Sequence, residues 1–336
     1  MPATSRTGAA EGRRTVNGHR RGWGGVAGMA VACALAVAGS LVPLRDAPAP
    51  VTAAHPGQVT RAQYAAAQDG SDTCDRPERS LDPNSGSLSG EAVARIKAHG
   101  KLVVGVDQNS YLWGFRDPAT GDLAGFDIDL VKAIAKDILG DENAVQYLTV
   151  PTADRILDIQ QKKVDMVVRT MTINCERISQ VAFSTAYFTA GQQILTLKNA
   201  SITGFDDSLA GKTVCTATGS TGAKELGKGS HGAKVMLVPN QLDCLVRLQL
   251  GLADAVFTDN ALGAGQAAQD PNVHLVGDTV TKEPYGVAMN LADTDLVRRV
   301  NKVLDTYRAD GSWTASYDHW LAHDLPGIKP PTPLYK

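Results

Sequence analysis

The sequence KLVVGV at residues 101–106 decides the fold class, because it has the length and composition of a fully buried strand. Apolar residues at helical spacing follow over 130–138 and predict an amphipathic helix that ends at Gly140. Another strand is expected at 145–150, and a third at 164–168. Strands and helices that alternate in this order predict a parallel α/β sheet.

The alternation begins again after about residue 190. Strands are expected at 213–217, 235–238, 254–257 and 273–276, with helices between them. The extended stretches near 187–196 and 281–289 would join the two α/β units. Two crossings between two lobes predict a hinge around a cleft, which can close on a ligand.

These boundaries divide the chain into two lobes. The first lobe is expected to comprise residues 89–190 and 285–325, and the second residues 191–284. Residues 45–88 are expected to form an extracellular linker, because their first part is rich in Ala, Pro and Gln. Folded structure should start near Ser89, which we expect to cap the first helix.

The N-terminus carries the features of an export segment. Residues 1–22 hold five arginines and one acid, and 23–44 form an apolar run without charge. The basic part should stay in the cytoplasm, which places the later residues outside the membrane. We favour retention of the apolar run as an anchor, although cleavage as a signal fits as well. Lipidation of Cys33 and twin-arginine export have weaker support.

Four cysteines follow the export segment, and three pairings of them are possible. An even number of cysteines in an exported chain predicts two disulfides. We favour Cys215 with Cys244, because both fall in one lobe, and Cys74 with Cys175. Metal binding is not expected, because no CxxC spacing occurs and the seven histidines are scattered.

The composition argues against nucleic-acid binding. The net charge is −2 and aromatic residues make up only 5% of the chain. A nucleic-acid partner would favour a basic excess and aromatic residues for stacking. We also expect a monomer that binds a small molecule and needs no cofactor.

Four polar groups follow strands, and ligands of open α/β sheets bind beyond the carboxyl ends of strands. They are the segment from Arg169 to Arg177, the turn 218–221, Asp259, and Thr152 with Arg155. Taken singly, each has a plainer interpretation. The arginines could be solvated, and Thr152, the turn and Asp259 could be helix caps.

Together, seven motifs carry a resemblance to a known family. They lie at 103–107, 125–130, 169–177, 210–214, 219–221, 254–259 and 283–286. Residues 89–322 resemble the polar-amino-acid solute-binding proteins (family 3) of bacterial ABC importers, and most closely their actinobacterial glutamate/aspartate-binding branch. The resemblance implies a type II periplasmic-binding-protein fold with two hinge strands and a ligand cleft.

The resemblance also implies roles for individual residues at the backbone end of the ligand. Arg177 would bind the α-carboxylate. Thr172 and the turn with Ser220 and Thr221 would assist it. Asp259 would hold the α-ammonium, helped by Thr170.

At the side-chain end of the ligand, the resemblance implies that Arg155 and Thr152 meet a carboxylate. Gln241 would add another contact, and Tyr111 with Phe115 would form an apolar wall. Arg116 and Arg169 are alternative partners for the side-chain carboxylate.

The expected function is therefore the capture of glutamate or aspartate outside the membrane, for delivery to the membrane subunits of an ABC importer. A buried charge without a partner costs several kcal/mol, and glutamine would leave Arg155 without an anion. The alternative is a membrane-tethered sensor that reports the amino acid to a membrane partner. We do not expect an enzyme, because no Glu or His is left for acid–base work and no GxSxG motif occurs.

Overall fold

The computed structural model describes residues 74–336. The predictions for 1–22 and 23–44, and for Cys33, lie outside the described residues. Within 74–336, every helix is too short or too polar to cross a membrane.

The first sheet has the strand order β5-β1-β6-β15-β7. Strand β1 (Leu102–Val106) pairs in parallel with β5 (Val145–Thr149) and with β6 (Met166–Val167). Strand β15 (Ala288–Met289) runs antiparallel to β6 and to β7 (Ala182–Phe183). The parallel part confirms the predicted α/β class, and a strand from late in the chain completes the sheet.

Four helices from distant parts of the sequence share one hydrophobic core with this sheet. They are α2 (Glu91–His99), α3 (Phe126–Leu139), α9 (Thr294–Ala309) and α10 (Ser312–Trp320). Gly140 ends α3 in the left-handed conformation that glycine adopts without strain, as predicted. We call this sheet with its helices the first lobe.

The second sheet has the strand order β11-β10-β12-β9-β13. Strand β10 (Thr213–Ala217) pairs in parallel with β11 (Lys234–Val238) and β12 (Ala255–Asp259). Strand β9 (Gln192–Leu197) runs antiparallel to β12 and to β13 (Val273–Val276). This sheet, with the helices that follow its parallel strands, is the second lobe. Those helices are α6 (Thr221–Lys228), α7 (Gln241–Gln249) and α8 (Asn260–Gln269).

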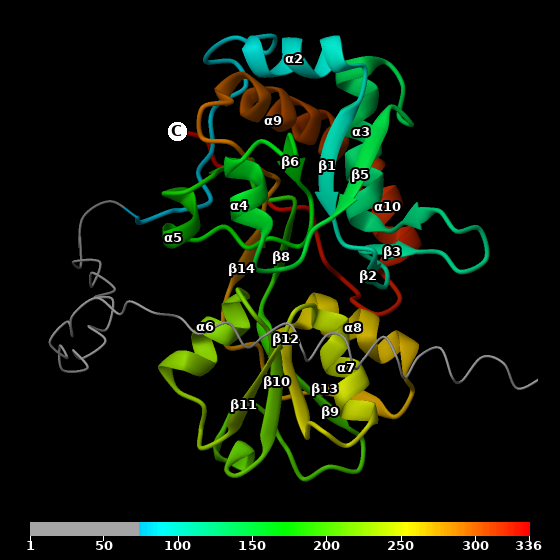
Figure 1. The fold of residues 1–336 in the computed structure, drawn as a ribbon, viewed down its shortest axis with the longest axis vertical. Coiled ribbons are helices and arrows are strands. Elements are labelled where there is room, and N and C mark those ends of the chain that lie inside the picture. The colour runs from blue at the N-terminus through cyan, green and yellow to red at the C-terminus, as the bar shows by residue number, and fades with distance from the viewer. Residues whose placement is uncertain (1–73) are drawn as a thin grey trace, which may run out of the picture. The chain divides into compact units, whose positions relative to one another are not determined.

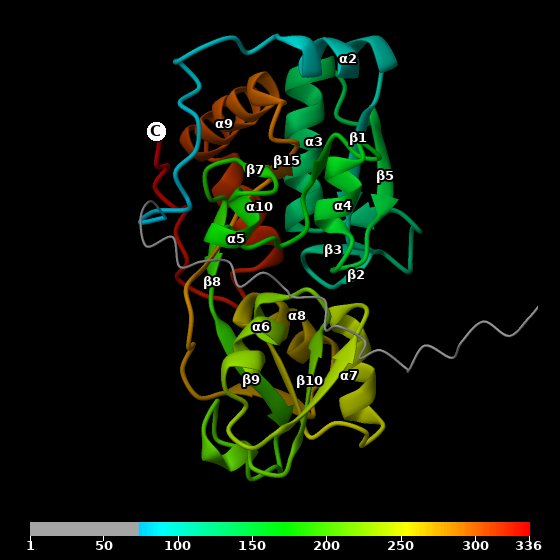
Figure 2. The ribbon, with the colours of Figure 1, turned by 60° about the vertical axis from the view of Figure 1, so that its left-hand side comes forward.

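Two strands join the lobes. Strand β8 (Phe188–Ala190) leads from the first lobe to the second and pairs with the returning strand β14 (Glu283–Tyr285). Figures 1 and 2 show this pair between the two sheets. The arrangement is the two-lobed α/β fold that the alternation of elements predicts.

The segment before α2 is attached to the first lobe well before Ser89. Cys74 is bonded to Cys175, and the buried Ser80 donates from Oγ to Phe183 O at 2.6 Å. Ser89 does not cap α2. Its predicted role is filled by Asp295 of α9, which accepts from Val93 N at 3.0 Å. The acceptor comes from another helix, so local sequence spacing could not reveal it.

Both favoured disulfides are confirmed. Cys74 is paired with Cys175, and Cys215 on β10 is paired with Cys244 on α7.

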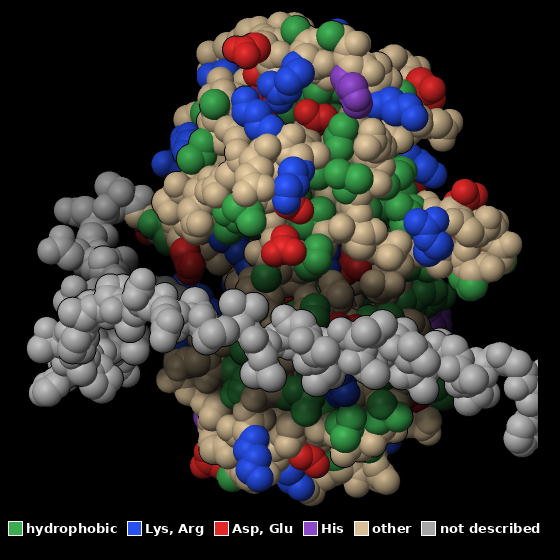
Figure 3. All heavy atoms as spheres, in the orientation of Figure 1, with side chains coloured by type: hydrophobic (Ala, Val, Ile, Leu, Met, Phe, Trp, Pro, Cys, Tyr) green, Lys and Arg blue, Asp and Glu red, His purple; other side chains and the backbone are tan. Residues whose placement is uncertain are grey.

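Figure 3 shows basic and acidic side chains interspersed over the visible face of the first lobe.

Candidate functional site

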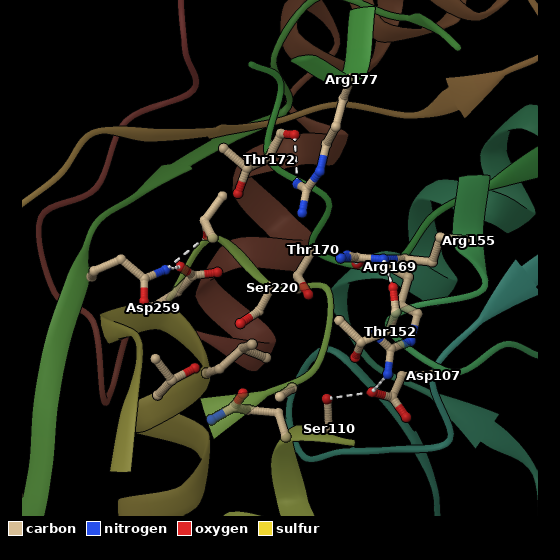
Figure 4. Close-up of a pocket in the computed structure, with 16 residues that line it drawn as sticks. Asp107, Ser110, Thr152, Arg155, Arg169, Thr170, Thr172, Arg177, Ser220 and Asp259 are labelled. Atoms are coloured by element: carbon tan, nitrogen blue, oxygen red, sulfur yellow. Dashed lines mark hydrogen bonds and ion pairs between the residues drawn. The ribbon is translucent and has the colours of Figure 1, made fainter. Parts of the chain in front are cut away.

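A polar cavity lies between the two lobes. The lining side chains come from both lobes, and Figure 4 shows them converging on one space. The cavity is lined by Asp107, Ser110, Thr152, Arg155, Arg169, Thr170, Thr172, Arg177, Gln192, Ala217, Ser220, Thr221, Gln241, Thr258, Asp259 and Leu262.

Arg177 extends into the cavity from the short helix α5 (Cys175–Ile178), whose N-terminus is capped by Asn174. Its Nη1 donates to Thr172 O at 2.8 Å, and its Nη2 donates across the cleft to Gly219 O at 3.1 Å. Each of these nitrogens carries a second N–H. Burial lowers the pKa of Arg177. The remaining donors can therefore bind an anion in a place shielded from water.

Asp259 ends β12 on the opposite lobe. Its carboxylate does not cap α8. It accepts from Tyr285 Oη at 2.6 Å and from Gln192 Nε2. Burial and the nearby carboxylate of Glu283 raise the pKa of Asp259 to about 7, against the hydrogen bond from Tyr285. A cation in the cavity would offset both effects, so this carboxylate is suited to hold an ammonium group.

Arg155 begins the helix α4 (Arg155–Gln160) and is only 4% exposed. Its Nε donates to Thr152 O at 2.9 Å, and its Nη1 donates to Arg169 O at 3.3 Å. Burial, followed by the charges of Arg177 and Arg169, lowers the pKa of Arg155 well below its usual value. The two carbonyl oxygens orient Arg155 but do not neutralise it. An anionic ligand group would do so.

Arg169 forms the wall beside Arg155. Its Nη2 lies 2.8 Å from Asp107 Oδ2, and both side chains are buried. Its Nη1 donates to Thr152 Oγ1 at 3.0 Å. Helix capping, the plainer interpretation of Thr152, does not hold, because the N-cap position of α4 is Asp154. The Thr152 hydroxyl is engaged by an arginine from another strand end.

Thr170 occupies a strained backbone conformation at the centre of the site, with φ of 41°. A β-branched residue rarely adopts such a value, because its side chain crowds the backbone. The buried Asp127 accepts from Thr170 N at 3.1 Å and from Tyr187 Oη at 2.7 Å. Burial raises the pKa of Asp127 to about 7. These contacts hold Thr170 where Figure 4 shows it, at the centre of the cavity.

The turn before α6 supplies two hydroxyl groups from the second lobe. Ser220 is the N-cap of α6 and accepts from Ala223 N at 3.0 Å. Thr221 Oγ1 accepts from Gln192 Nε2 at 3.0 Å. Helix capping, the plainer interpretation of Ser220, is therefore correct, yet both residues line the cavity as well.

Nine residues expected at the site line the cavity. They are Thr152, Arg155, Thr170, Thr172, Arg177, Ser220, Thr221, Gln241 and Asp259. Arg169, an alternative partner for the ligand side chain, lies with them. The other alternative, Arg116, is exposed on a small sheet and donates to Gly121 O at 2.6 Å.

Neither residue of the expected apolar wall lines this cavity. Phe115 packs its ring against Tyr111 and Trp320, with centroids 4.9 and 5.7 Å away, and does not line the cavity. Tyr111 lines a smaller neighbouring cavity instead. Asp107 fixes the start of this loop by accepting from Gln108 N and Asn109 N. Apolar lining comes from Leu262 and Ala217.

The sequence reasoning missed several lining residues and the partners of the key carboxylates. The missed lining residues are Asp107, Ser110, Gln192, Ala217, Thr258 and Leu262. Asp107 and Thr258 stand in motifs that carried the resemblance, so their places at strand ends were an available signal. The crossing strand β14 carries Tyr285, and only the tertiary fold brings it to Asp259.

Comparison with protein families gives one match that spans most of the described chain. The family described as bacterial extracellular solute-binding proteins, family 3, matches residues 102–323. The matched region contains every residue that lines the cavity.

Individual relatives carry different ligand names. The ABC transporter glutamine-binding protein GlnH of Bacillus subtilis is 36% identical over 234 residues, which cover 70% of this chain and 86% of the relative. The L-glutamate/L-aspartate-binding protein of Pseudomonas aeruginosa is 31% identical over 244 residues, or 69% of this chain and 80% of the relative. These matches support the family. They do not single out the glutamate/aspartate branch.

Solved structures support the same fold. An ancestral arginine-binding protein bound to glutamine is 38% identical, with a TM-score of 0.62. The match covers 66% of this chain and 98% of that protein.

Proposed function

Since this chain belongs to the bacterial extracellular solute-binding proteins of family 3, we propose that it captures glutamate or aspartate between its lobes and delivers it to an ABC importer. The two lobes would close around one amino acid. The membrane subunits of the importer would then recognise the closed, ligand-bound conformation.

The backbone groups of the amino acid would occupy the side of the cavity between Arg177 and Asp259. The free N–H groups of Arg177 match a carboxylate. Asp259 would pair with the α-ammonium across the cleft. Thr170 and Thr172 from the first lobe, with Ser220 and Thr221 from the second, would add hydroxyl contacts. Both lobes hold the ligand in this way, so binding favours closure.

The main observation in favour of an acidic ligand is the environment of Arg155. Figure 4 shows Arg155, Arg169 and Thr152 on one side of the cavity and Asp259 on the other. On the Arg155 side, two arginines face a single lining carboxylate, which is Asp107. A ligand carboxylate there would neutralise the remaining positive charge, whereas a carboxamide would leave it buried without a partner.

Glutamine is the second candidate ligand, because a relative at 36% identity is named as a glutamine-binding protein. A neutral side chain would then meet the same donors through its carbonyl oxygen alone. The membrane-tethered sensor remains the alternative role, and the capture site would serve it equally. We propose no catalysis, so an amino acid recovered after long incubation with the protein should be unchanged.

Isothermal titration of the purified full-length protein with glutamate, aspartate, glutamine, asparagine and arginine tests the proposal. Arg177→Ala should abolish binding of every amino acid. Arg155→Ala should weaken the binding of glutamate and aspartate far more than that of glutamine, because it removes the positive charge that pairs with a side-chain carboxylate. Equal losses for all ligands in Arg155→Ala would remove Arg155 from the side-chain pocket. No heat with any amino acid would refute amino-acid capture.

A further inference from the structure

The buried pair of Asp107 and Arg169 has no role in the proposed contacts to ligand. Both side chains are at least nine-tenths buried, and the Oδ2 and Nη2 atoms lie 2.8 Å apart. Asp107 also accepts from Ser110 Oγ at 2.8 Å and from Gln108 N at 2.8 Å. A carboxylate that already has these donors is poorly placed to accept from a ligand. Its contact with Arg169 is an ion pair rather than a hydrogen bond, and this contact fixes the position of one end of the guanidinium.

Arg169, once held, controls the hydroxyl group of Thr152. The second arm of the guanidinium, Nη1, donates to Thr152 Oγ1 at 3.0 Å. A hydroxyl that accepts from a cation turns its own O–H away from that cation. Thr152 lines the cavity, so its O–H remains free to donate to a ligand there.

Donors then predominate on this side of the cavity. Arg155 is fixed by its bonds to Thr152 O and Arg169 O, and it offers only N–H groups. The buried Gln241 Nε2 has no hydrogen-bond partner among residues 74–336. Ser110 differs, because its hydrogen is donated to Asp107 and it offers the cavity lone pairs.

A carboxylate and a carboxamide of equal length differ in what they present to these donors. Both oxygens of a carboxylate accept. A carboxamide replaces one oxygen by an NH2 group, whose hydrogens would face the donors and leave them unsatisfied. A buried donor without an acceptor costs about 1–3 kcal/mol.

We propose that Asp107 and Arg169 are positioning residues that make the site select carboxylate side chains over carboxamides. The pair acts through Thr152, by orienting its hydroxyl, and through Arg155, whose Nη1 is bound by Arg169 O. The inference rests on the proposed function, because it concerns how the same site chooses among amino acids.

The test is the ratio of the glutamine to the glutamate dissociation constant, measured by titration calorimetry on full-length variants. Arg169→Lys keeps the charge but cannot reach Asp107 and Thr152 together, so we expect the ratio to fall at least tenfold. Asp107→Asn should also lower it. Thr152→Val should lower the ratio, and Thr152→Ser, which restores the hydroxyl, should return it toward the wild-type value.

If Asp107 and Arg169 acted only through their net charge, Asp107→Asn would have the opposite effect on the ratio. Asp107→Asn removes a negative charge from the cavity, so a purely electrostatic role would raise the preference for glutamate. An unchanged or raised ratio in Asp107→Asn and Arg169→Lys overturns the inference. If both variants fail to fold, an unchanged ratio in Thr152→Val overturns it alone.

The wild-type ratio separates this inference from the proposed function. A wild-type protein that prefers glutamine refutes the acidic ligand and the positioning role together. A wild-type protein that prefers glutamate, with variants that keep its ratio, refutes the positioning role only.

Discussion

Asp259 stands out among the individual residues, because it faces the cavity while burial and Glu283 disfavour its charge. Its pKa of about 7 lies within the range where binding is readily measured. The partners that lower this pKa, led by Tyr285, come from another element and leave the carboxylate accessible to the cavity. The protonation of Asp259 should therefore affect ligand binding and protein stability in opposite directions.

Ligand affinity should fall as the pH falls below about 7. The ammonium group of an amino acid stays charged in this range, and it pairs only with the ionised form of Asp259. The dissociation constant should rise between pH 8 and pH 5, approaching about tenfold per pH unit. Titrations at several pH values check this, and the pH dependence should disappear in Asp259→Asn. A dissociation constant that is constant over this range would contradict the assignment.

The protein without ligand should show the opposite trend. The pKa of Asp259 and of Asp127 is raised from 3.8 to about 7 in the folded state. Their contribution to stability is therefore complete below pH 3.8 and is lost as the pH rises through about 7. Thermal unfolding should give a lower Tm at pH 8 than at pH 6, and Asp259→Asn should reduce that difference. A Tm that rises over this interval in the wild type, with no change in the variant, would refute the prediction.

At the level of elements, the two disulfides connect different parts of the structure. Cys215–Cys244 ties β10 to α7 across 29 residues, inside the core of the second lobe. Cys74–Cys175 ties residue 74 to the first residue of α5, the helix that carries Arg177. The first should mainly stabilise the fold, and the second should also position a ligand-binding arginine.

Replacing each pair by serines separates these roles. Cys215→Ser with Cys244→Ser should lower the free energy of unfolding by about 3–4 kcal/mol, the loop-closure value for such a separation. Denaturant titration measures that loss, and ligand affinity should change little at low denaturant. Cys74→Ser with Cys175→Ser should weaken ligand binding several-fold more than the other double variant does. Equal effects on affinity would show that α5 keeps its position without the disulfide.

At the scale of the whole molecule, the two lobes meet through small residues of α8. Trp113 Nε1 from the first lobe donates to Ala261 O at 3.0 Å. Gly265 lies so close to the first lobe that an added Cβ would stand 2.5 Å from Tyr111 O. These contacts involve no ligand. They allow the lobes to approach closely enough to enclose the cavity.

A methyl group at Gly265 should hold the lobes apart. Gly265→Ala places its Cβ against a backbone oxygen that belongs to the opposite lobe, so the closed state should become rarer. If one molecule in ten remained competent to close, the apparent dissociation constant would rise about tenfold. Small-angle scattering should show a larger radius of gyration. Gly227→Ala, in α6 with open space around the added methyl, is the matched control. The same radius and affinity in both variants would contradict this view of closure.

The sequence by itself determined the local elements and most of the site. Apolar runs and helical spacing predicted the strands and helices, because burial imposes those periods along the chain. The motifs at strand ends identified Arg177, Arg155 and Asp259, because parallel strands bring their carboxyl ends to one edge. The four cysteines after the export segment predicted two disulfides, and the sequence favoured one of the three possible pairings without deciding it.

Only the tertiary structure decided which partner each polar group takes. Asp295 caps a helix some 200 residues earlier in the chain, Tyr285 donates to Asp259, and Arg169 donates to the Thr152 hydroxyl. Such bonds join residues that share no local pattern. The apolar ring of Phe115 turned away from the cavity for the same reason, because Trp320 and Tyr111 provide its packing. Local periodicity determines which segments are buried, whereas the choice among possible partners depends on distances that exist only in the folded chain.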